Sequence, residues 1–324
     1  MTPDDCRALP GDSALEKTAG PGCHLQDCSL FASRTPCPAV LTHPARDGRD
    51  YRTPGPWRPD GTVGNTGYEG VVKILLEQDE VNPDKPNNDG QTPLWRAAQY
   101  GYDRVAKILL EHGSVNPEKL DKGGYTPLWC AARNGNEGVV KLLLGRDEVH
   151  PDKPSNEGET PLWGAAWGGH EGVAKILLER NEVNPGKPDK FGLTPLACAA
   201  CNGHEGVVEI LLGRDDVDPE QPEKNGITPF SWAAWGGCEG VVKTLLQRDD
   251  VNPDRPDKFG LTPLACAVWN GHEGVVKILL RRGDVNPDKP DNLGRTPLWY
   301  ASVSGRTRVI ALLQPLASAT PGTT

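Results

Sequence analysis

Four residues in the middle of the chain have the types that metal or redox chemistry requires. Cys198, Cys201 and His204 are separated by two residues each, and Cys238 lies further along the chain. On a helix, Cys198 and Cys201 would share one face, so a weak zinc or thiol site there is one hypothesis. Cys198 recurs as Cys266 without a second cysteine beside it, however, which favours small, partly buried thiols.

Three His-Glu pairs also suggest a metal site, because a zinc-protease helix carries His-Glu followed by a second His. The pairs are His170-Glu171, His204-Glu205 and His272-Glu273, and the residues four positions after each His are Ala174, Val208 and Val276. Four further cysteines lack the Cys-x2-Cys spacing of a zinc knuckle, namely Cys6, Cys23, Cys28 and Cys37. We therefore expect no catalytic residue, no cofactor and no metal site, and predict that the protein is not an enzyme.

The elements that carry these residues follow an internal repeat of 34 residues. A glycine followed two residues later by Thr-Pro marks seven units, at Gly90, Gly124, Gly158, Gly192, Gly226, Gly260 and Gly294. A half-unit with a single helical segment precedes them. One short unit cannot bury its apolar faces alone, so stacking against its neighbours must complete the core.

Each unit carries the signals of two short helices. Thr194 before Pro195 provides an N-cap hydroxyl and a proline at the first helical position, and Gly203 ends this helix. The second helix, from Glu205 to about Leu212, has Val and Leu at helical spacing. Glu-Lys pairs four residues apart predict a solvent-facing side at Glu69-Lys73, Glu137-Lys141, Glu171-Lys175, Glu239-Lys243 and Glu273-Lys277. Paired prolines between units predict protruding loops with little regular strand pairing.

The pattern G-x-T-P-L-x-x-A-A-x-x-G-x-x-x-V-V-x-x-L-L-x-x-x-x-V-N resembles the ankyrin repeat and covers about 250 residues. Tetratricopeptide repeats share the 34-residue period but lack the Thr-Pro-Leu helix start. The resemblance implies an all-α solenoid of stacked helix-turn-helix units with Pro-rich protruding loops. Ankyrin repeats usually have His after Thr-Pro-Leu, where this chain has Trp95, Trp129, Trp163, Ala197, Ser231, Ala265 and Trp299.

The resemblance also implies a function. It indicates a non-catalytic protein-protein interaction scaffold or adaptor that binds its partner in the concave groove of the stack. The loop sequence is similar to that of ankyrin arrays in filamentous fungi, which often form the C-terminal part of nucleotide-binding receptor-type sensors. A regulatory array separated from such a sensor is therefore an alternative function, and a neighbouring effector would distinguish it.

The repeat register predicts three segments. Residues 1–64 form an arm with nine prolines and no repeat register, expected to be disordered or loosely packed. Residues 65–314 form the array, with a half repeat at 65–89 and repeats starting at 90, 124, 158, 192, 226, 260 and 294. Pro315 is expected to end the last helix, leaving residues 315–324 as a tail. The half repeat leaves Val72, Leu75 and Leu76 uncovered unless the arm caps them, and a fragmentary chain is the alternative.

The variable positions at the end of each first helix and at the loop tips predict the partner-binding surface. They carry aromatic, apolar and Arg side chains, and aromatic residues and Arg often act as interface hot spots. The candidates are Tyr100, Tyr125, Arg133, Trp167, Phe191, Leu193, Trp235, Phe259, Leu261 and Trp269. The Trp residues after Thr-Pro-Leu, Trp95, Trp129, Trp163 and Trp299, are instead expected to fill packing positions.

Charge and hydropathy exclude other partner classes. The 44 acidic and 35 basic side chains give a net charge of -9, which disfavours nucleic acid as the main partner. No segment approaches the roughly 18 continuous apolar residues of a membrane span, and the first residues do not resemble a signal peptide. We expect an intracellular protein of the cytoplasm or nucleus that binds another protein and no small-molecule substrate.

Overall fold

The computed structural model describes residues 66–317, and within them the side chains of residues 69–314. These residues belong to one compact unit, residues 55–324. The expectations for residues 1–64, including the four N-terminal cysteines, lie outside the described residues, as does the end of the tail.

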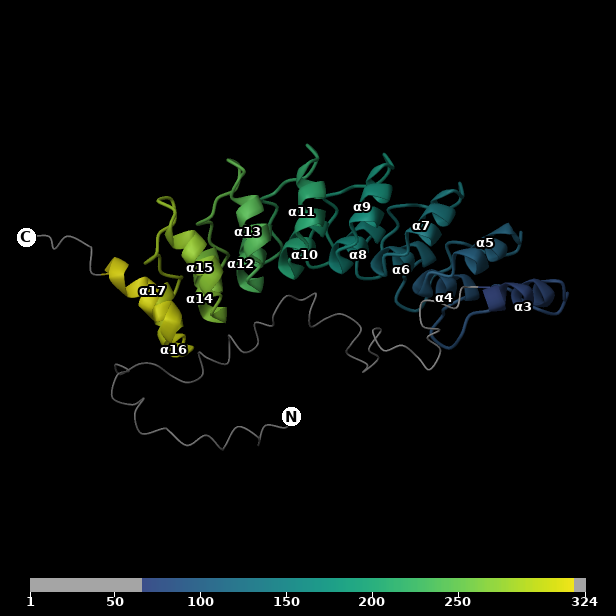
Figure 1. Ribbon diagram of the computed structural model, residues 1–324, viewed down its shortest axis with the longest axis horizontal. Coiled ribbons are helices and arrows are strands. Elements are labelled where there is room, and N and C mark those ends of the chain that lie inside the picture. The colour runs from purple at the N-terminus through teal and green to yellow at the C-terminus, as the bar shows by residue number, and fades with distance from the viewer. Residues whose placement is uncertain (1–65, 318–324) are drawn as a thin grey trace, which may run out of the picture. The chain divides into compact units, whose positions relative to one another are not determined.

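The described part of the chain consists of helix pairs that follow one another in a row, without a strand (Figure 1). The first helices of the seven repeats are α4 (Pro93–Tyr100), α6 (Pro127–Arg133), α8 (Pro161–Gly168), α10 (Pro195–Asn202), α12 (Pro229–Gly236), α14 (Pro263–Asn270) and α16 (Pro297–Val303). The second helices are α5 (Asp103–Glu111), α7 (Glu137–Leu144), α9 (Glu171–Leu178), α11 (Glu205–Leu212), α13 (Glu239–Leu245), α15 (Glu273–Leu280) and α17 (Thr307–Ala317). The half repeat contributes α3 (Thr66–Leu76), and first helices pack on first helices of the neighbouring repeats.

The predicted start and end of the first helix are confirmed. In α8, the Thr160 hydroxyl accepts a hydrogen bond from the N–H of Trp163 at 3.1 Å, and Pro161 occupies the first turn. Gly169 ends the helix with a φ of 73°, in the left-handed region that favours glycine. The Thr cap recurs in all seven first helices. The cap fixes the residue at which each helix begins, although helices of seven or eight residues have little stability of their own.

The core lies between helix pairs, as the repeat argument requires. Val139, Val140 and Leu143 of α7 are fully buried, and the corresponding residues of α9, α11, α13 and α15 are buried as well.

The predicted solvent-facing side of the second helices is confirmed, because Lys73, Lys141, Lys175, Lys243 and Lys277 are all exposed. Of the five Glu-Lys pairs on this side, only Glu137 and Lys141 form an ion pair within 4 Å, at 3.9 Å. Glu171 and Glu239 lie over Gly206 and Gly274 of the next second helix, where a Cβ would collide with them. Glu69 and Glu273 instead form ion pairs with Arg104 and Arg308 of the next second helix.

A column of side chains at the start of the second helices connects neighbouring repeats. The Nε2 atoms of His170, His204 and His272 donate to main-chain carbonyl oxygens of the preceding repeat, at 3.0, 2.9 and 2.9 Å. Asn136 and Cys238 occupy the same position, and the Cys238 Sγ lies 3.6 Å from its carbonyl acceptor. The His residues of the His-Glu pairs therefore have a structural role: they join neighbouring repeats.

The loops are linked from repeat to repeat more regularly than predicted. One main-chain hydrogen bond joins neighbouring loop tips, for instance from the Lys190 N–H to the Glu157 carbonyl at 2.8 Å. A basic side chain also reaches the carboxylate of the preceding loop in Lys119–Asp84, Lys153–Glu118, Lys187–Asp152, Arg255–Glu220 and Lys289–Asp254. We call these five pairs the loop ladder. It is interrupted where Gly186 and Gln221 replace both partners of one pair.

The two ends of the array differ from expectation in detail. Helix α17 does not end at Pro315, since a proline near its C-terminus removes one hydrogen bond of the last turn without preventing two further helical residues. On α3, Leu75 is exposed at 46%, as predicted, whereas Val72 and Leu76 are half-buried. Val71 and Ile74 of α3 are also exposed, at 54% and 62%.

No helix in residues 66–317 combines the length and the apolar character that a membrane span needs.

Candidate protein-binding surface

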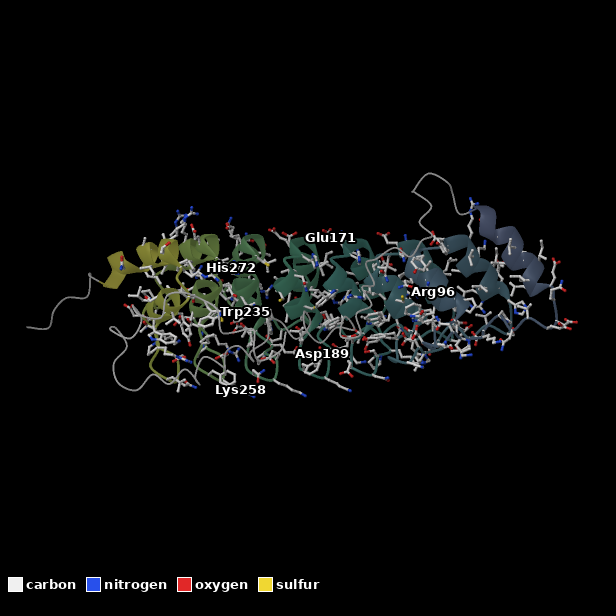
Figure 2. The ribbon with its side chains drawn as sticks, turned by 90° about the horizontal axis from the view of Figure 1, so that it is seen from below. Arg96, Glu171, Asp189, Trp235, Lys258 and His272 are labelled. Atoms are coloured by element: carbon white, nitrogen blue, oxygen red, sulfur yellow. The ribbon has the colours of Figure 1, made fainter. Side chains whose placement is uncertain are left out.

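The candidate surface lies on the first helices and on the loops that precede them. Figure 2 shows Trp235 between the edge that carries Glu171 and the opposite edge, where Lys258 lies on a loop. We call the described half-buried or exposed members of the predicted set the stripe; they are Tyr100, Tyr125, Arg133, Trp167, Phe191, Trp235, Phe259 and Trp269. Tyr100 and Phe259 are the most accessible, at 44% and 39%.

Two predicted surface residues face the interior instead. Leu193 and Leu261 are only 1% and 6% exposed, so neither offers area to a partner. Each directly follows a left-handed glycine, and its N–H donates to an aspartate of the same loop, Asp189 or Asp257, at 2.8 Å. This turn directs the side chain toward the core. The loop tip before the glycine remains outside, which is why Phe259 is exposed.

The tryptophans differ in exposure by repeat position, except that Trp299, which was expected to pack like the others after Thr-Pro-Leu, is half-buried in the last repeat. Trp95, Trp129 and Trp163, which follow Thr-Pro-Leu, are 3%, 5% and 1% exposed and pack as predicted. Trp167, at the end of α8, is half-buried. Sequence reasoning missed Trp232, which is 3% exposed; its signal is that it occupies the repeat position of the buried Cys198 and Cys266.

An aromatic cluster around Arg133 forms the most elaborate part of the stripe. The Arg133 guanidinium carbon lies 5.7 Å from the ring centre of Trp129 and 5.5 Å from that of Trp167. The rings of Tyr125 and Trp129 are 4.0 Å apart, and Trp163 stacks on Trp167 at 5.6 Å with an interplanar angle of 13°. The aromatic faces hold the guanidinium through cation–π attraction, and burial lowers the pKa of Arg133.

Glu159 places a carboxyl group within this cluster, which sequence reasoning also missed. It is 7% exposed, and burial raises its pKa to about 7 against the opposing effects of the Tyr125 hydroxyl and Arg133. The signal in the sequence is a charged residue at the repeat position that Leu193 and Leu261 fill with apolar side chains. At neutral pH this carboxyl is therefore close to its midpoint of titration.

A second aromatic cluster, near the C-terminal end of the array, pairs its Arg side chain with a buried carboxylate. Arg295 lies 5.3 Å from the ring centre of Trp299 and donates to Asp291 at 2.6 Å. The Tyr300 hydroxyl donates to the same carboxylate at 2.5 Å. Although burial acts to raise the pKa of Asp291, these hydrogen bonds hold it below the usual range. The carboxylate is thus ionised and paired with Arg295.

The thiols of the array are packed side chains. Cys130 and Cys198 are 2% and 0% exposed, and Cys201 and Cys238 are half-buried. Burial raises the pKa of Cys130 and of Cys238, which opposes thiolate formation. In the described part of the chain, no three His, Cys, Asp or Glu residues are arranged to hold a metal ion.

Stacked helix pairs with capped first helices and linked loop tips define a helical solenoid. A family model described as ankyrin repeats in three copies matches residues 63–121, 114–189, 162–257 and 249–321. The chain belongs to the ankyrin-repeat family, which confirms the fold predicted from the 34-residue pattern. The ankyrin repeat domain of human ASB11 has a similar structure, with a TM-score of 0.59 and 24% identity over 69% of this chain and 98% of that chain. No curated protein gives a significant match.

Proposed function

We propose that the protein is a non-catalytic scaffold or adaptor that binds a protein partner through the stripe. Ankyrin repeats are generally protein-protein interaction modules, and the chain belongs to that family. The observation that carries the proposal is the separation of the aromatic residues by exposure. Trp95, Trp129 and Trp163 in their packing positions are covered, whereas Trp167, Trp235 and Trp269 keep part of their surface in solvent. Partly exposed Trp and Arg side chains are those that most often dominate binding energy.

The stripe extends over successive repeats, which suits a partner that lies along the stack. Trp235 and Trp269 occupy the same position in consecutive repeats, and packed helices lie about 8–10 Å apart. Binding energy would then come from a few anchors spaced by that interval, with neighbouring contacts excluding water.

The test is affinity capture with the intact chain beside the triple variant Trp167→Ala, Trp235→Ala and Trp269→Ala. We expect the intact chain to retain a defined partner and the triple variant to lose it at least tenfold. A matched control, Val81→Ala with Leu120→Ala, removes exposed apolar side chains outside the stripe, at 36% and 41% exposure, and should retain the partner.

Circular dichroism and thermal melting must show that each variant keeps the native helix content. Equal capture of the partner by a folded triple variant would exclude the stripe as the binding surface. Loss of capture by the control pair would instead place the partner on the loops between repeats.

A further inference from the structure

The loop tips in the C-terminal half of the array carry apolar side chains that reach solvent. The residue before each repeat-marking glycine is Asp89, Gly123 and Glu157 in the first three full repeats, and Phe191, Asn225, Phe259 and Leu293 in the last four. Leu293 and Phe259 are 68% and 39% exposed, and Phe191 is half-buried. A single exposed apolar residue is ordinary, whereas three along one row of tips are typical of an interaction surface.

Two lysines add positive charge to the same row. Lys258 directly precedes Phe259, and Lys224 lies on the tip between Phe191 and Phe259. Both lysines are exposed, and Figure 2 shows Lys258 at the outer edge of the array. Lys258 donates to the main-chain carbonyl of Lys224, and no carboxylate of the described residues lies within 4 Å of either ammonium group. Both groups therefore keep donors for the carboxylates of a partner.

The acidic residues of these loops serve the turns instead of the outer surface. The Asp257 carboxylate accepts hydrogen bonds from the N–H groups of Phe259 and Leu261, both at 2.8 Å. Glu223 does the same one repeat earlier, where it accepts from the N–H of Asn225 at 2.7 Å and is only 5% exposed. Each loop thus holds its negative charge against its own main chain and its positive charge at the tip.

Hydrogen bonds between neighbouring loops hold the tips in a fixed row, so little order has to be gained on binding. Packed helices of neighbouring repeats lie about 8–10 Å apart, and three residues of extended chain span about 10 Å. A segment that lies along the tips would therefore present every third residue to successive tips. The main-chain bonds run from Lys224 to Phe191 at 3.0 Å, from Lys258 to Asn225 at 2.9 Å and from Asn292 to Phe259 at 3.0 Å.

We propose that Phe191, Lys224, Lys258, Phe259 and Leu293, which we call the tip ridge, bind an extended acidic segment of the protein partner. In this segment, Glu or Asp and apolar residues recur at every third position. The inference rests on the proposed function and specifies the charge of the partner. The whole chain has a net charge of -9, so overall charge would repel such a segment, and its attraction must come from the ridge.

The probes are two fluorescein-labelled peptide amides, one with four repeats of Leu-Glu-Ser and one with four repeats of Leu-Gln-Ser. Each is titrated with the intact chain in about 50 mM NaCl, and its fluorescence anisotropy is measured. Exposed ion pairs contribute a factor of about 1.4–5 each, so we expect the Glu peptide to bind about fivefold more tightly. This preference should shrink in 0.5 M NaCl because salt screens the pairs. Equal affinities, or no saturable binding of the Glu peptide, overturns the proposal.

Two double variants identify the lysines responsible. Lys224→Gln with Lys258→Gln should lower the affinity for the Glu peptide to that for the Gln peptide. Lys122→Gln with Lys175→Gln removes two exposed lysines outside the tip ridge and should leave the preference unchanged. An equal loss in both variants would show a general effect of charge and overturn the proposal. Thermal melting of each variant checks that the fold is retained.

The apolar part of the ridge is tested by Phe259→Ala with Leu293→Ala, which should weaken both peptides at least threefold. Unchanged binding of both peptides would overturn the inclusion of these side chains. An anionic bilayer is the other surface that suits exposed Lys and Phe, so the intact chain is also sedimented with vesicles of phosphatidylcholine and phosphatidylserine in a 4:1 ratio. We expect no co-sedimentation. Co-sedimentation that is lost in Lys224→Gln with Lys258→Gln would assign the ridge to a bilayer and overturn the proposal.

The tip ridge and the proposed function fail separately. If the peptide tests fail while the triple Trp variant loses its partner, the stripe binds a partner of different chemistry and only the tip ridge is rejected. Capture that survives loss of the three Trp side chains rejects the stripe itself.

Discussion

Restoring the missing pair of the loop ladder should stabilise the array. At five interfaces a basic side chain of one loop contacts the carboxylate of the preceding loop, and at the sixth the partners are Gly186 and Gln221. The perturbation is therefore Gly186→Asp together with Gln221→Lys, which gives this interface the residues of its neighbour, Asp152 and Lys187.

The expected magnitude follows from the geometry of the neighbouring pair. Lys187 Nζ lies 2.8 Å from Asp152 Oδ2 and also donates to the Asp152 carbonyl at 3.0 Å, with side-chain exposures of 33% and 15%. Exposed ion pairs contribute about 0.2–1 kcal/mol, and a charged hydrogen bond with partly covered partners contributes somewhat more. A Cβ at Gly186 would meet the Gln221 Oε1 at an ordinary 3.4 Å, so an Asp side chain fits. We expect a coupling free energy of about 0.5–1.5 kcal/mol.

Urea unfolding of the parent chain, both single variants and the double variant gives a double-mutant cycle. The double variant should exceed the sum of the single variants by the coupling free energy, and the excess should shrink in 1 M NaCl because salt screens the pair. Gly186→Asp alone adds a separate contribution by restricting the unfolded chain, which the cycle removes. A coupling below about 0.3 kcal/mol with native helix content would refute the view that the ladder stabilises the stack.

Three further changes test other parts of the structure. Glu159→Gln should stabilise the fold at pH 8 by about 1–3 kcal/mol and have little effect at pH 5. Burial raises the folded-state pKa of Glu159 from 4.5 to about 7. The buried carboxyl group is therefore tolerated in its neutral form at low pH, and this stability is lost as the pH rises through 7. Urea melts at both pH values measure it, and a pH-independent effect would contradict the burial argument. Cys238→His should replace the 3.6 Å contact of the thiol with an imidazole-to-carbonyl hydrogen bond like those of His204 and His272, and should raise the free energy of unfolding by about 1 kcal/mol. An unchanged or lower melting temperature would mean that these side chains do not stabilise the stack. Leu143→Ala should cost about 2–5 kcal/mol and Leu75→Ala, at the same repeat position, less than 1 kcal/mol, since their exposures are 0% and 46%; similar losses in urea unfolding would show that α3 is covered.

Local signals allowed the first helix of each repeat to be predicted from the sequence. A Thr hydroxyl before Pro caps the first turn of the helix, and a glycine nine residues later ends its last turn. Each signal depends only on residues within one turn, so it acts in the same way in an isolated unit and in the stack. The same holds for the position of Trp163, whose burial follows from its register within the unit.

The errors arose where a neighbouring repeat decides the outcome. The Glu-Lys spacing is a property of one helix, but in α7, α9, α11, α13 and α15 the glycine at the second position lets the acidic side chain of the preceding repeat lie over it. The turn around Asp189 likewise directs Leu193 inward by hydrogen bonds that the residue types alone do not specify. Arg133 and Glu159 belong to different repeats and meet only through stacking, so no spacing rule within one unit could find them.

The column that joins the repeats explains why the stripe is free to vary. The side chains at the start of the second helices donate to the main-chain carbonyls of Gln99, Arg133, Trp167, Cys201, Trp235 and Trp269. These acceptors belong to the residues that end the first helices, and most of their side chains form the stripe. Because the bond uses only the carbonyl oxygen, any side chain at these positions is compatible with it. The repeats are thus joined through the main chain of the residues whose side chains form the stripe, and substitutions of these side chains leave the connection between repeats intact.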